Sequence, residues 1–278
     1  MYKLLVTDVD GTLLDSSSKL TELNKKALLD CIASGINVII ATGKSIDSTM
    51  FIIKQLGLKL PQITFSGAVL ITTERKIISA VKISPDLYLD VISKVREKGY
   101  EPLAAAIDGK IYCQEYSKPM KYVTAVGEKI NKADNLMSDY FKENAVSVSI
   151  PINESDPMDL FIRKTYNGVL QVLRSGEYFF DILSIDASKG KALTGLIKDL
   201  GIKKDEVVSF GDSHNDISLF EASGLSIAVK NSYPELLEIA DIVTDENYNS
   251  GLGRAIYKYI LEKDLPKKYI EYAYRTAR

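Results

Sequence analysis

The sequence predicts an α/β protein with a Rossmann-like parallel-sheet core and an inserted α+β cap domain. Short apolar runs alternate with helical patterns in the first and last thirds of the chain. Buried strands that alternate with helices are typical of a parallel sheet with right-handed crossovers. The middle of the chain instead holds paired strand-like runs with two helical patterns, which is typical of an α+β unit. We therefore expect a discontinuous core domain over residues 1–84 and 187–278, and a cap domain over residues 85–186.

The first third contains three apolar runs that we expect to be buried strands, at residues 3–8, at residues 37–41 and from residue 63 onward. Between the first two, Leu23, Ala27 and Cys31 recur at helical spacing, with Thr21 as the candidate N-cap. Residues 45–56 form a second helical pattern that ends at a glycine, a common helix terminator.

The remaining elements follow the two patterns described above. In the middle, Asp108-Gly109 joins the strand-like runs 101–105 and 111–114, which predicts a β-hairpin. Helical patterns cover residues 87–96 and 159–173. The last third predicts, in order, a helix over 192–200, a strand over 207–210, a short helix from about 215, a strand over 225–229, a helix after Pro234 and a terminal helix over 255–278 that packs on the core.

Composition excludes several classes of protein. The chain has 278 residues, of which 46% are hydrophobic and 26% charged, so it can bury a sizeable core. A formal charge of -2 gives no overall basic field for a nucleic acid, and no apolar run reaches the length of a membrane span. Cys31 and Cys113 are expected to be buried thiols, which suits a reducing cytoplasm. His214 is the only histidine, which excludes a zinc site built on several histidines.

The first motif with chemical potential is Asp8-Val9-Asp10-Gly11-Thr12, directly after an apolar run. On an extended strand, residues i and i+2 point to the same side, so both carboxylates would enter one small space. Two like charges at that separation are costly unless a cation or a proton lies between them. The pair therefore suggests a divalent metal site, an acid/base pair, or a nucleophile beside its proton donor; a plain Asp-Gly turn is the simpler alternative.

Three further polar segments lie where strands end or helices begin, and these ends line the ligand crevice of an open parallel sheet. Thr42-Gly43-Lys44 offers a hydroxyl and a glycine N–H, which suit a phosphate oxygen. Lys189 lies at a helix start, where a bound anion would explain a cation that the helix dipole disfavours. The segment 211–216 packs two carboxylates and an amide into one turn, and such hard oxygen ligands suit Mg²⁺. Taken singly, each segment could be an ordinary cap, turn or exposed lysine.

With these four segments in this order, the chain resembles the haloacid dehalogenase (HAD) superfamily, specifically the Cof-type phosphatases with a class IIB cap. The resemblance covers nearly the whole chain. It implies that Asp8 attacks phosphorus to form an aspartyl-phosphate and that Asp10 moves the proton of the leaving group. It also implies that Asp8, the backbone carbonyl of Asp10 and Asp212 hold Mg²⁺. The residues implied to hold the phosphoryl group are Thr42, Gly43, Lys189 and Asn215.

Some positions depart from the family pattern or carry a less defined role. Lys44 stands where many relatives have arginine, and Ser66 stands where an asparagine is usual, so both changes bear on the substrate. Asp216 is expected to support the turn or to bind Mg²⁺ through water. For His214 we favour a local surface or packing role.

The resemblance implies a Mg²⁺-dependent phosphatase acting on a small phosphorylated metabolite such as a sugar phosphate, with no nucleic acid or membrane as partner. A phosphomutase of the same fold and a non-catalytic phospholigand-binding protein are the alternatives. An ion-pumping ATPase is disfavoured because such relatives carry threonine at the position of Asp10. The sequence leaves the substrate and the oligomeric state open.

Overall fold

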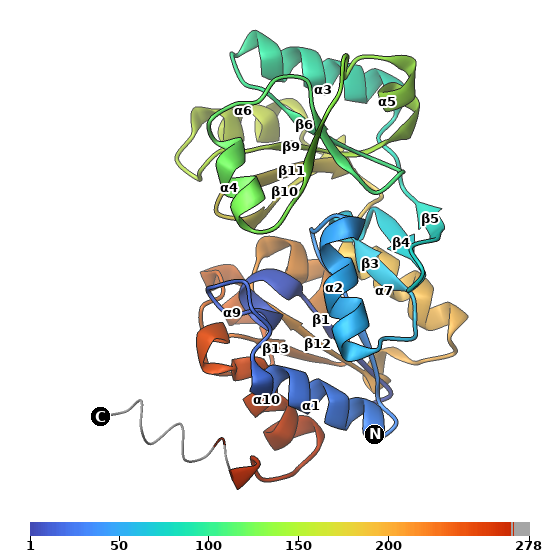
Figure 1. Ribbon diagram of the computed structural model, residues 1–278, viewed down its shortest axis with the longest axis vertical. Coiled ribbons are helices and arrows are strands. Elements are labelled where there is room, and N and C mark those ends of the chain that lie inside the picture. Colours follow the sequence, from blue (N-terminus) through green and yellow to red (C-terminus); the bar gives the residue numbers. More distant parts are fainter. Residues whose placement is uncertain (268, 270–278) are drawn as a thin grey trace.

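The strands of the first and last thirds of the chain meet in one sheet, in a computed structural model that describes residues 1–267 and 269 (Figure 1). Five parallel strands form this core sheet in the order β14-β13-β12-β1-β2. Their bounds are β1 Leu4–Thr7, β2 Asn37–Ile40, β12 Val207–Gly211, β13 Leu225–Ala228 and β14 Ile242–Val243. Strand β1 lies between β2 and β12 and pairs in parallel with both, which confirms the predicted parallel-sheet core.

Helices cover both faces of the core sheet. Leu5 of β1 packs in one apolar cluster with α1, α2 and α10, whereas Leu4 and Val6 pack in another with α7 and α8. This alternation follows from the two-residue period of a strand. The longer helices are α1 Glu22–Ala33, α2 Ile46–Leu56 and α7 Lys189–Asp199, and the shorter ones are α8 Ile217–Glu221, α9 Pro234–Ile239 and α10 Gly251–Ala255. Single turns lie at η1 Val9–Leu13, η3 Lys204–Glu206, η4 His214–Asp216, η5 Asn247–Asn249 and η6 Ile256–Ile260.

The third predicted strand joins the core sheet through only one bridge. Ile63 pairs in parallel with Ala41, but its strand, β3 Gln62–Thr64, otherwise belongs to a small antiparallel sheet with β4 Val69–Ile71 and β5 Ile77–Ala80. The strand stops because Phe65 and Ser66 take positive φ angles of 47° and 51°, which turn the chain into η2 Phe65–Gly67.

The middle of the chain forms a second layer above the core in Figure 1. Its six-stranded sheet has the order β10-β11-β9-β6-β7-β8. The strands are β6 Leu103–Ala106, β7 Ile111–Cys113, β8 Ile130–Lys132, β9 Ala145–Ile150, β10 Leu170–Gly176 and β11 Phe179–Ser184. The helices are α3 Pro85–Glu97, α4 Met120–Ala125, α5 Asp139–Asn144 and α6 Pro157–Thr165.

The two faces of the cap sheet serve different purposes. Phe180 and Ile182 of β11 pack with α3, α5 and α6 in one apolar cluster, on the side away from the core (Figure 1). The alternate residues Phe179, Asp181 and Leu183 line a cavity on the other side, between cap and core. Inserted cap sheets over a parallel core confirm the predicted fold class, while the boundaries at residues 84/85 and 186/187 stay a prediction.

Two helices differ from their predicted extents. The helix predicted over residues 159–173 begins two residues earlier, at Pro157, and ends at Thr165. Gly168 has a φ of 70°, which turns the chain into β10. The terminal helix predicted over 255–278 continues past α10 through Ile256–Ile260 and then breaks, because Glu262 takes a φ of 51° and Pro266 follows; of the later described residues, Lys267 and Tyr269 are helical. The end of that prediction, residue 268 and residues 270–278, lies outside the described residues.

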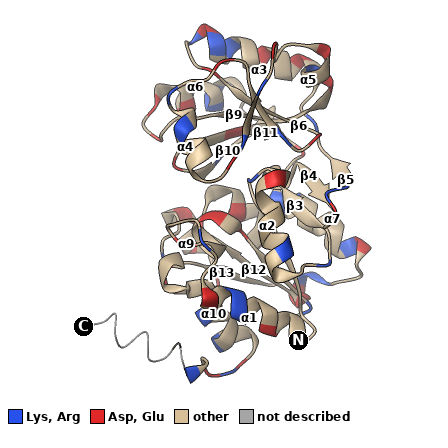
Figure 2. Cartoon of the chain, in the orientation of Figure 1, with Lys and Arg blue, Asp and Glu red and all other residues tan. Residues whose placement is uncertain are grey.

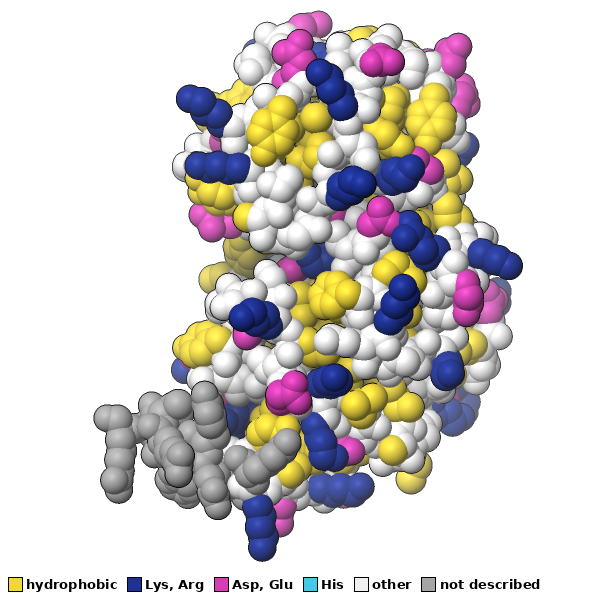
Figure 3. Space-filling model, in the orientation of Figure 1, with side chains coloured by type: hydrophobic (Ala, Val, Ile, Leu, Met, Phe, Trp, Pro, Cys, Tyr) yellow, Lys and Arg dark blue, Asp and Glu magenta, His cyan; other side chains and the backbone are white. Residues whose placement is uncertain are grey.

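Cys31 and Cys113 are both buried free thiols, as predicted. Charged side chains of both signs are distributed over core and cap (Figure 2), and on the face drawn in Figure 3 lysines and arginines are scattered among other side chains. None of the helices in the described part of the chain is both long and apolar enough to cross a bilayer.

Candidate active site

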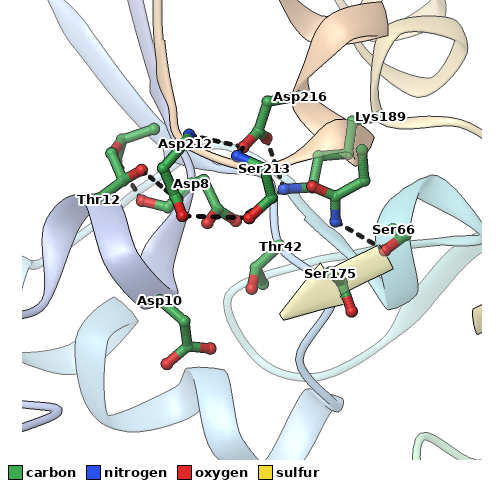
Figure 4. Close-up of polar contacts among 12 residues, drawn as sticks. Asp8, Asp10, Thr12, Thr42, Ser66, Ser175, Lys189, Asp212, Ser213 and Asp216 are labelled. Atoms are coloured by element: carbon green, nitrogen blue, oxygen red, sulfur yellow. Dashed lines mark hydrogen bonds and ion pairs between the residues drawn. The ribbon is translucent and has the colours of Figure 1, made fainter. Parts of the chain in front are cut away.

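The register of the core sheet brings the sequence motifs together. Thr7, the last residue of β1, is paired with Ile40 of β2 and with Phe210 of β12. The Asp8 N–H donates to the Phe210 carbonyl at 3.0 Å and so continues the ladder by one residue. The segments after β1, β2 and β12 therefore leave the sheet at the same edge, and their side chains converge there (Figure 4).

The Gly-Thr that follows the aspartate pair is explained by its contact with Asp212. Gly11 has a φ of 75°, and a Cβ placed on it would lie 2.4 Å from Asp212 Oδ2, so this position requires glycine. Thr12 donates from Oγ1 to Asp212 Oδ1 at 2.6 Å. The loop after β1 is thus shaped to hold the carboxyl group of Asp212 beside Asp8.

Three buried carboxylates form the centre of the site. Oxygen atoms of Asp8, Asp212 and Asp216 lie within 4.8 Å of one another. The fully buried ammonium group of Lys189 lies 2.7 Å from Asp8 Oδ1 and 2.7 Å from Asp216 Oδ1. Three carboxylates with one ammonium group leave two negative charges uncompensated when all four groups are ionised, a costly arrangement inside a protein.

The pKa values of Asp8, Asp212 and Lys189 depart from their ordinary values. Burial raises the pKa of Asp8 well above its ordinary value, although Lys189 opposes the shift. Burial and the nearby Asp216 raise the pKa of Asp212 to about 7. Burial alone would lower the pKa of Lys189, but Asp216 and Asp8 outweigh it, so the pKa of the lysine is raised. A bound cation would oppose the upward shifts in the pKa of Asp8 and Asp212, because it favours the ionised form of both carboxyl groups.

The donor set fits a hard divalent cation, because such ions take carboxylate oxygens and Mg²⁺ commonly uses only one or two protein carboxylates. Asp216 is largely engaged in the turn. Its Oδ2 accepts from the N–H groups of Asp212 and Ser213 at 3.0 Å each, and its Oδ1 faces Lys189. Each oxygen of Asp212 accepts one hydrogen bond from a hydroxyl group, of Thr12 or of Ser213, so the carboxyl groups of Asp8 and Asp212 keep lone pairs for a metal ion.

The carboxyl group of Asp10 points away from this cluster (Figure 4). Its Oδ2 lies 3.0 Å from Lys44 Nζ, and its side chain is 36% exposed. Lys44 also donates to the carbonyl of Val126 in the cap at 2.8 Å. Partial burial raises the pKa of Asp10, and Lys44 opposes the shift. One buried lysine therefore connects Asp10 to the cap.

The segment after β2 faces the loop after β3. Thr42 accepts from the Lys44 N–H at 3.1 Å, and Ser66 receives a hydrogen bond from Asn215 Nδ2 at 3.1 Å. A Cβ on Gly43 would lie 3.2 Å from Ser66 Oγ and 3.1 Å from the Cβ of Ser175 in the cap. The polar groups of Thr42, Ser66 and Ser175, from three separate parts of the chain, therefore surround one small space.

That space belongs to a cavity of about 450 Å³ between cap and core. Of the predicted site residues, those that line it are Asp8, Asp10, Thr42, Gly43, Lys44 and Ser66. Other predicted site residues lie behind this wall. Lys189 contacts Asp8, Asp212 contacts Thr12, and Asn215 contacts Ser66. The structure thus brings every predicted site residue to one region.

Sequence reasoning missed several residues of this region. Thr12 lies in the first motif, but its residue type and position did not predict the contact with Asp212. On the cap side, Glu128, Ser175 and Asp181 line the cavity. An acid inside the apolar run of β11 was the only signal for Asp181, whereas Glu128 and Ser175 lie in segments without a chemical pattern.

His214 does not line the cavity. Its ring lies 4.4 Å from the ring of Tyr233, and its Nε2 lies 3.6 Å from Glu235 Oε2. These contacts are consistent with the local packing role expected for His214.

A parallel-sheet core, an inserted cap and a carboxylate cluster at an enclosed cavity define a capped α/β enzyme for small molecules. Residues 5–256 match the sequence profile of the haloacid dehalogenase-like hydrolase family, and the chain belongs to this family. YxeH of Bacillus subtilis is 29% identical over 280 residues, which cover 95% of this chain and 100% of that protein.

A phosphoglycolate phosphatase of Methanoculleus marisnigri is 26% identical over 271 residues, covering 93% of this chain and 97% of the relative. Among solved structures, a haloacid dehalogenase-like hydrolase from B. subtilis superposes with a TM-score of 0.82 at 25% identity, over 93% of this chain and 99% of that one. The protein is accordingly a HAD-family phosphatase of the Cof type, a phosphoric monoester hydrolase.

Proposed function

We propose that this protein is a Mg²⁺-dependent phosphatase that hydrolyses a small phosphorylated metabolite through an aspartyl-phosphate on Asp8. The observation that carries this proposal is the convergence of Asp8 and Asp10 on one cavity whose other wall is the cap. A carboxylate nucleophile and a nearby proton donor are the two groups that such a reaction requires of the protein.

In the first step, a carboxylate oxygen of Asp8 bonds to phosphorus while the ester P–O bond breaks. Lys189 holds Asp8 Oδ1, so Oδ2 is the oxygen available for attack. Asp10 gives its proton to the leaving oxygen; its raised pKa suits this role. In the second step, Asp10 takes a proton from water, which attacks phosphorus and releases phosphate from Asp8.

The remaining residues neutralise and position the phosphoryl group. Asp8, the backbone carbonyl of Asp10 and Asp212 would hold Mg²⁺, which supplies positive charge to the phosphoryl oxygens. Thr42, the Gly43 N–H, Lys189 and Asn215 would hold the phosphoryl group. Asp216 supports the turn through its contacts with Asp212 and Ser213.

The size of the cavity favours a metabolite over a protein substrate, because about 450 Å³ under a cap accommodates a small molecule. A closed cap also excludes water from the first step. A sugar phosphate or similar compound remains the favoured substrate class. The cytoplasmic location inferred from the sequence is part of the same proposal.

The test is phosphate release by the purified protein on a panel of phosphorylated metabolites. Asp8→Asn should lower kcat by roughly 10⁴-fold or more with an unchanged circular dichroism spectrum, because the nucleophile is lost. EDTA should silence the wild-type enzyme, and added Mg²⁺ should restore it. Asp186→Asn, at an acid with a 77% exposed side chain, is the matched control and should retain full activity. Turnover by Asp8→Asn would refute the nucleophile.

A further inference from the structure

The cap half of the cavity contains one buried acid with an oxygen that accepts no hydrogen bond from the described residues. Glu128, between α4 and β8, lines the cavity and is only 5% exposed. Its Oε1 accepts from the Ser45 N–H at 3.1 Å. Its Oε2 is buried and receives no hydrogen bond from the described residues. A buried acceptor without a donor is costly. A bound ligand that donates a hydrogen bond to this oxygen would remove that cost.

A second acid lines the same half of the cavity. Both oxygens of Asp181 accept from serine hydroxyls, Oδ1 from Ser149 and Oδ2 from Ser175. All three residues line the cavity. Each hydroxyl that donates its proton to Asp181 presents its lone pairs to other partners. This wall therefore offers acceptors to a ligand.

Positive charge is missing from this wall. Of the described cap residues that line the cavity, none is a lysine, an arginine or a histidine. On the core side, Lys44 is engaged by Asp10 and Val126, and the buried Lys189 by Asp8 and Asp216. A second anionic group on a substrate, such as a carboxylate or another phosphate, would face Glu128 and Asp181 without a counter-ion, which is unfavourable.

We propose that the cap selects a leaving group that is uncharged or cationic, that donates a hydrogen bond to Glu128 and that carries no second anionic group. Hydroxyl and ammonium groups are the two sources of such a donor. The stacked rings of Tyr122 and Tyr178, 3.9 Å apart, also line the cavity and provide an apolar surface for the carbon skeleton. This inference rests on the proposed phosphatase function and specifies its substrate class.

Four six-carbon phosphate esters test the proposal on the wild-type enzyme with Mg²⁺. Sorbitol 6-phosphate and 6-phosphogluconate differ by a hydroxymethyl or a carboxylate at the far end, glucosamine 6-phosphate adds an amine, and hexyl phosphate has no donor. We expect kcat/KM for the better of the sorbitol and glucosamine esters to exceed that for 6-phosphogluconate and for hexyl phosphate by about 10-fold or more. A kcat/KM for glucosamine 6-phosphate above that for glucose 6-phosphate, which has a hydroxyl group in place of the amine, identifies ammonium as the source, and the reverse order identifies hydroxyl.

Glu128→Gln tests the residue itself. The amide oxygen can still accept from the Ser45 N–H, while the amide NH₂ turns an acceptor into a donor. The ratio of kcat/KM for 6-phosphogluconate to that for sorbitol 6-phosphate should therefore rise by about 10-fold. Glu115→Gln, at an exposed cap acid outside the cavity, should leave this ratio at its wild-type value.

Two results would overturn the inference. One is a wild-type enzyme that hydrolyses all four esters with similar kcat/KM. The other is a Glu128→Gln variant whose kcat/KM falls by the same factor on every ester, which would indicate a purely structural contact with Ser45. An enzyme that releases phosphate from none of the four esters, nor from the wider metabolite panel, would instead contradict the phosphatase function.

Discussion

Lys189 is a fully buried cation whose ammonium group meets two carboxylates. From the sequence, a lysine at a helix start could have been an ordinary exposed side chain. The structure shows that Lys189 is not exposed. Because an unpaired ammonium group inside a protein costs several kcal/mol, the buried lysine requires its two carboxylate partners. The same contacts fix Asp8 in one orientation and leave its second oxygen free. At this scale, the site is a set of charges that neutralise one another incompletely.

Asp10 should be needed in both steps of the reaction. Asp10→Asn keeps the shape of the side chain but removes proton transfer, which is worth typically 10²–10⁴-fold in rate. We expect kcat to fall within that range. Because p-nitrophenolate leaves without protonation, the second step should then limit turnover of p-nitrophenyl phosphate. Intact-mass analysis of acid-quenched protein should consequently show phosphorylated Asp10→Asn enzyme in the steady state. An unchanged kcat would contradict the assignment.

Short irregular elements, rather than the long helices, hold the site together. The turn η2 lies against the start of α7, and a Cβ on Gly67 would lie 2.1 Å from the carbonyl carbon of Ser188. Gly67 also has a φ of 97°, which side chains rarely adopt. This close approach places Ser66 beside Asn215 and sets the position of Lys189 at the first turn of α7.

Gly67→Ala should therefore damage both stability and catalysis. Gly99→Ala is the matched control, since Gly99 has a φ of 84° but open space around its Cβ position. The control should lose about 1–2 kcal/mol of unfolding free energy from backbone strain alone and keep its kcat. Gly67→Ala should lose clearly more in urea denaturation and should also lower kcat, because α7 must shift. Equal losses for the two variants would show that the contact with Ser188 is unimportant.

At the scale of the whole molecule, core and cap each supply one side of the cavity. The core edge carries an excess of buried acids, and the cap closes a cavity above them. Hydrogen bonds between residues 44–48, at the start of α2, and residues 126–128 connect the two layers, from Lys44 to Val126, from Ser45 to Glu128 and from Ser48 to Gly127. Charge excess at one end and acceptors at the other define a cavity suited to a metal ion and a donor-rich ligand.

The free energy of unfolding of the metal-free protein should fall as pH rises from about 4 to about 7. Burial raises the pKa of Asp8, Asp10 and Asp181, and raises that of Asp212 to about 7. The folded protein therefore binds more protons than the unfolded chain, so the contribution of these groups is present below their unfolded pKa, near 4, and is lost as pH rises through the folded pKa.

Mg²⁺ should reverse this loss, because metal ligands must be deprotonated to bind. The rise in Tm caused by Mg²⁺ should be larger at about pH 7.5 than at about pH 5.5, where protonation of Asp212 alone would weaken binding by roughly 30-fold, or about 2 kcal/mol. Differential scanning calorimetry measures both shifts, with Asp186→Asn as the control. Identical Mg²⁺ shifts at the two pH values would contradict a carboxylate site of this kind.

The sequence determined the layout of the core and the identity of the groups at its edge. Strand periodicity and helix spacing predicted β1, β2, β12 and the helices between them, because those patterns are local. The order of the four polar segments predicted the class of enzyme. Predictions failed where a single backbone angle decides the outcome, as at Ser66, Gly168 and Glu262, since residue type fixes such angles only weakly.

Only the tertiary structure decided which residues those polar groups contact. Burial of Lys189 between Asp8 and Asp216, the fit of Thr12 against Asp212, and the unpaired oxygen of Glu128 all join residues that lie far apart in the chain. Register and packing between elements set such contacts, and neither follows a local pattern. The sequence therefore determined the chemistry that this phosphatase can perform, whereas only the fold of the cap decided which groups a substrate must present to it.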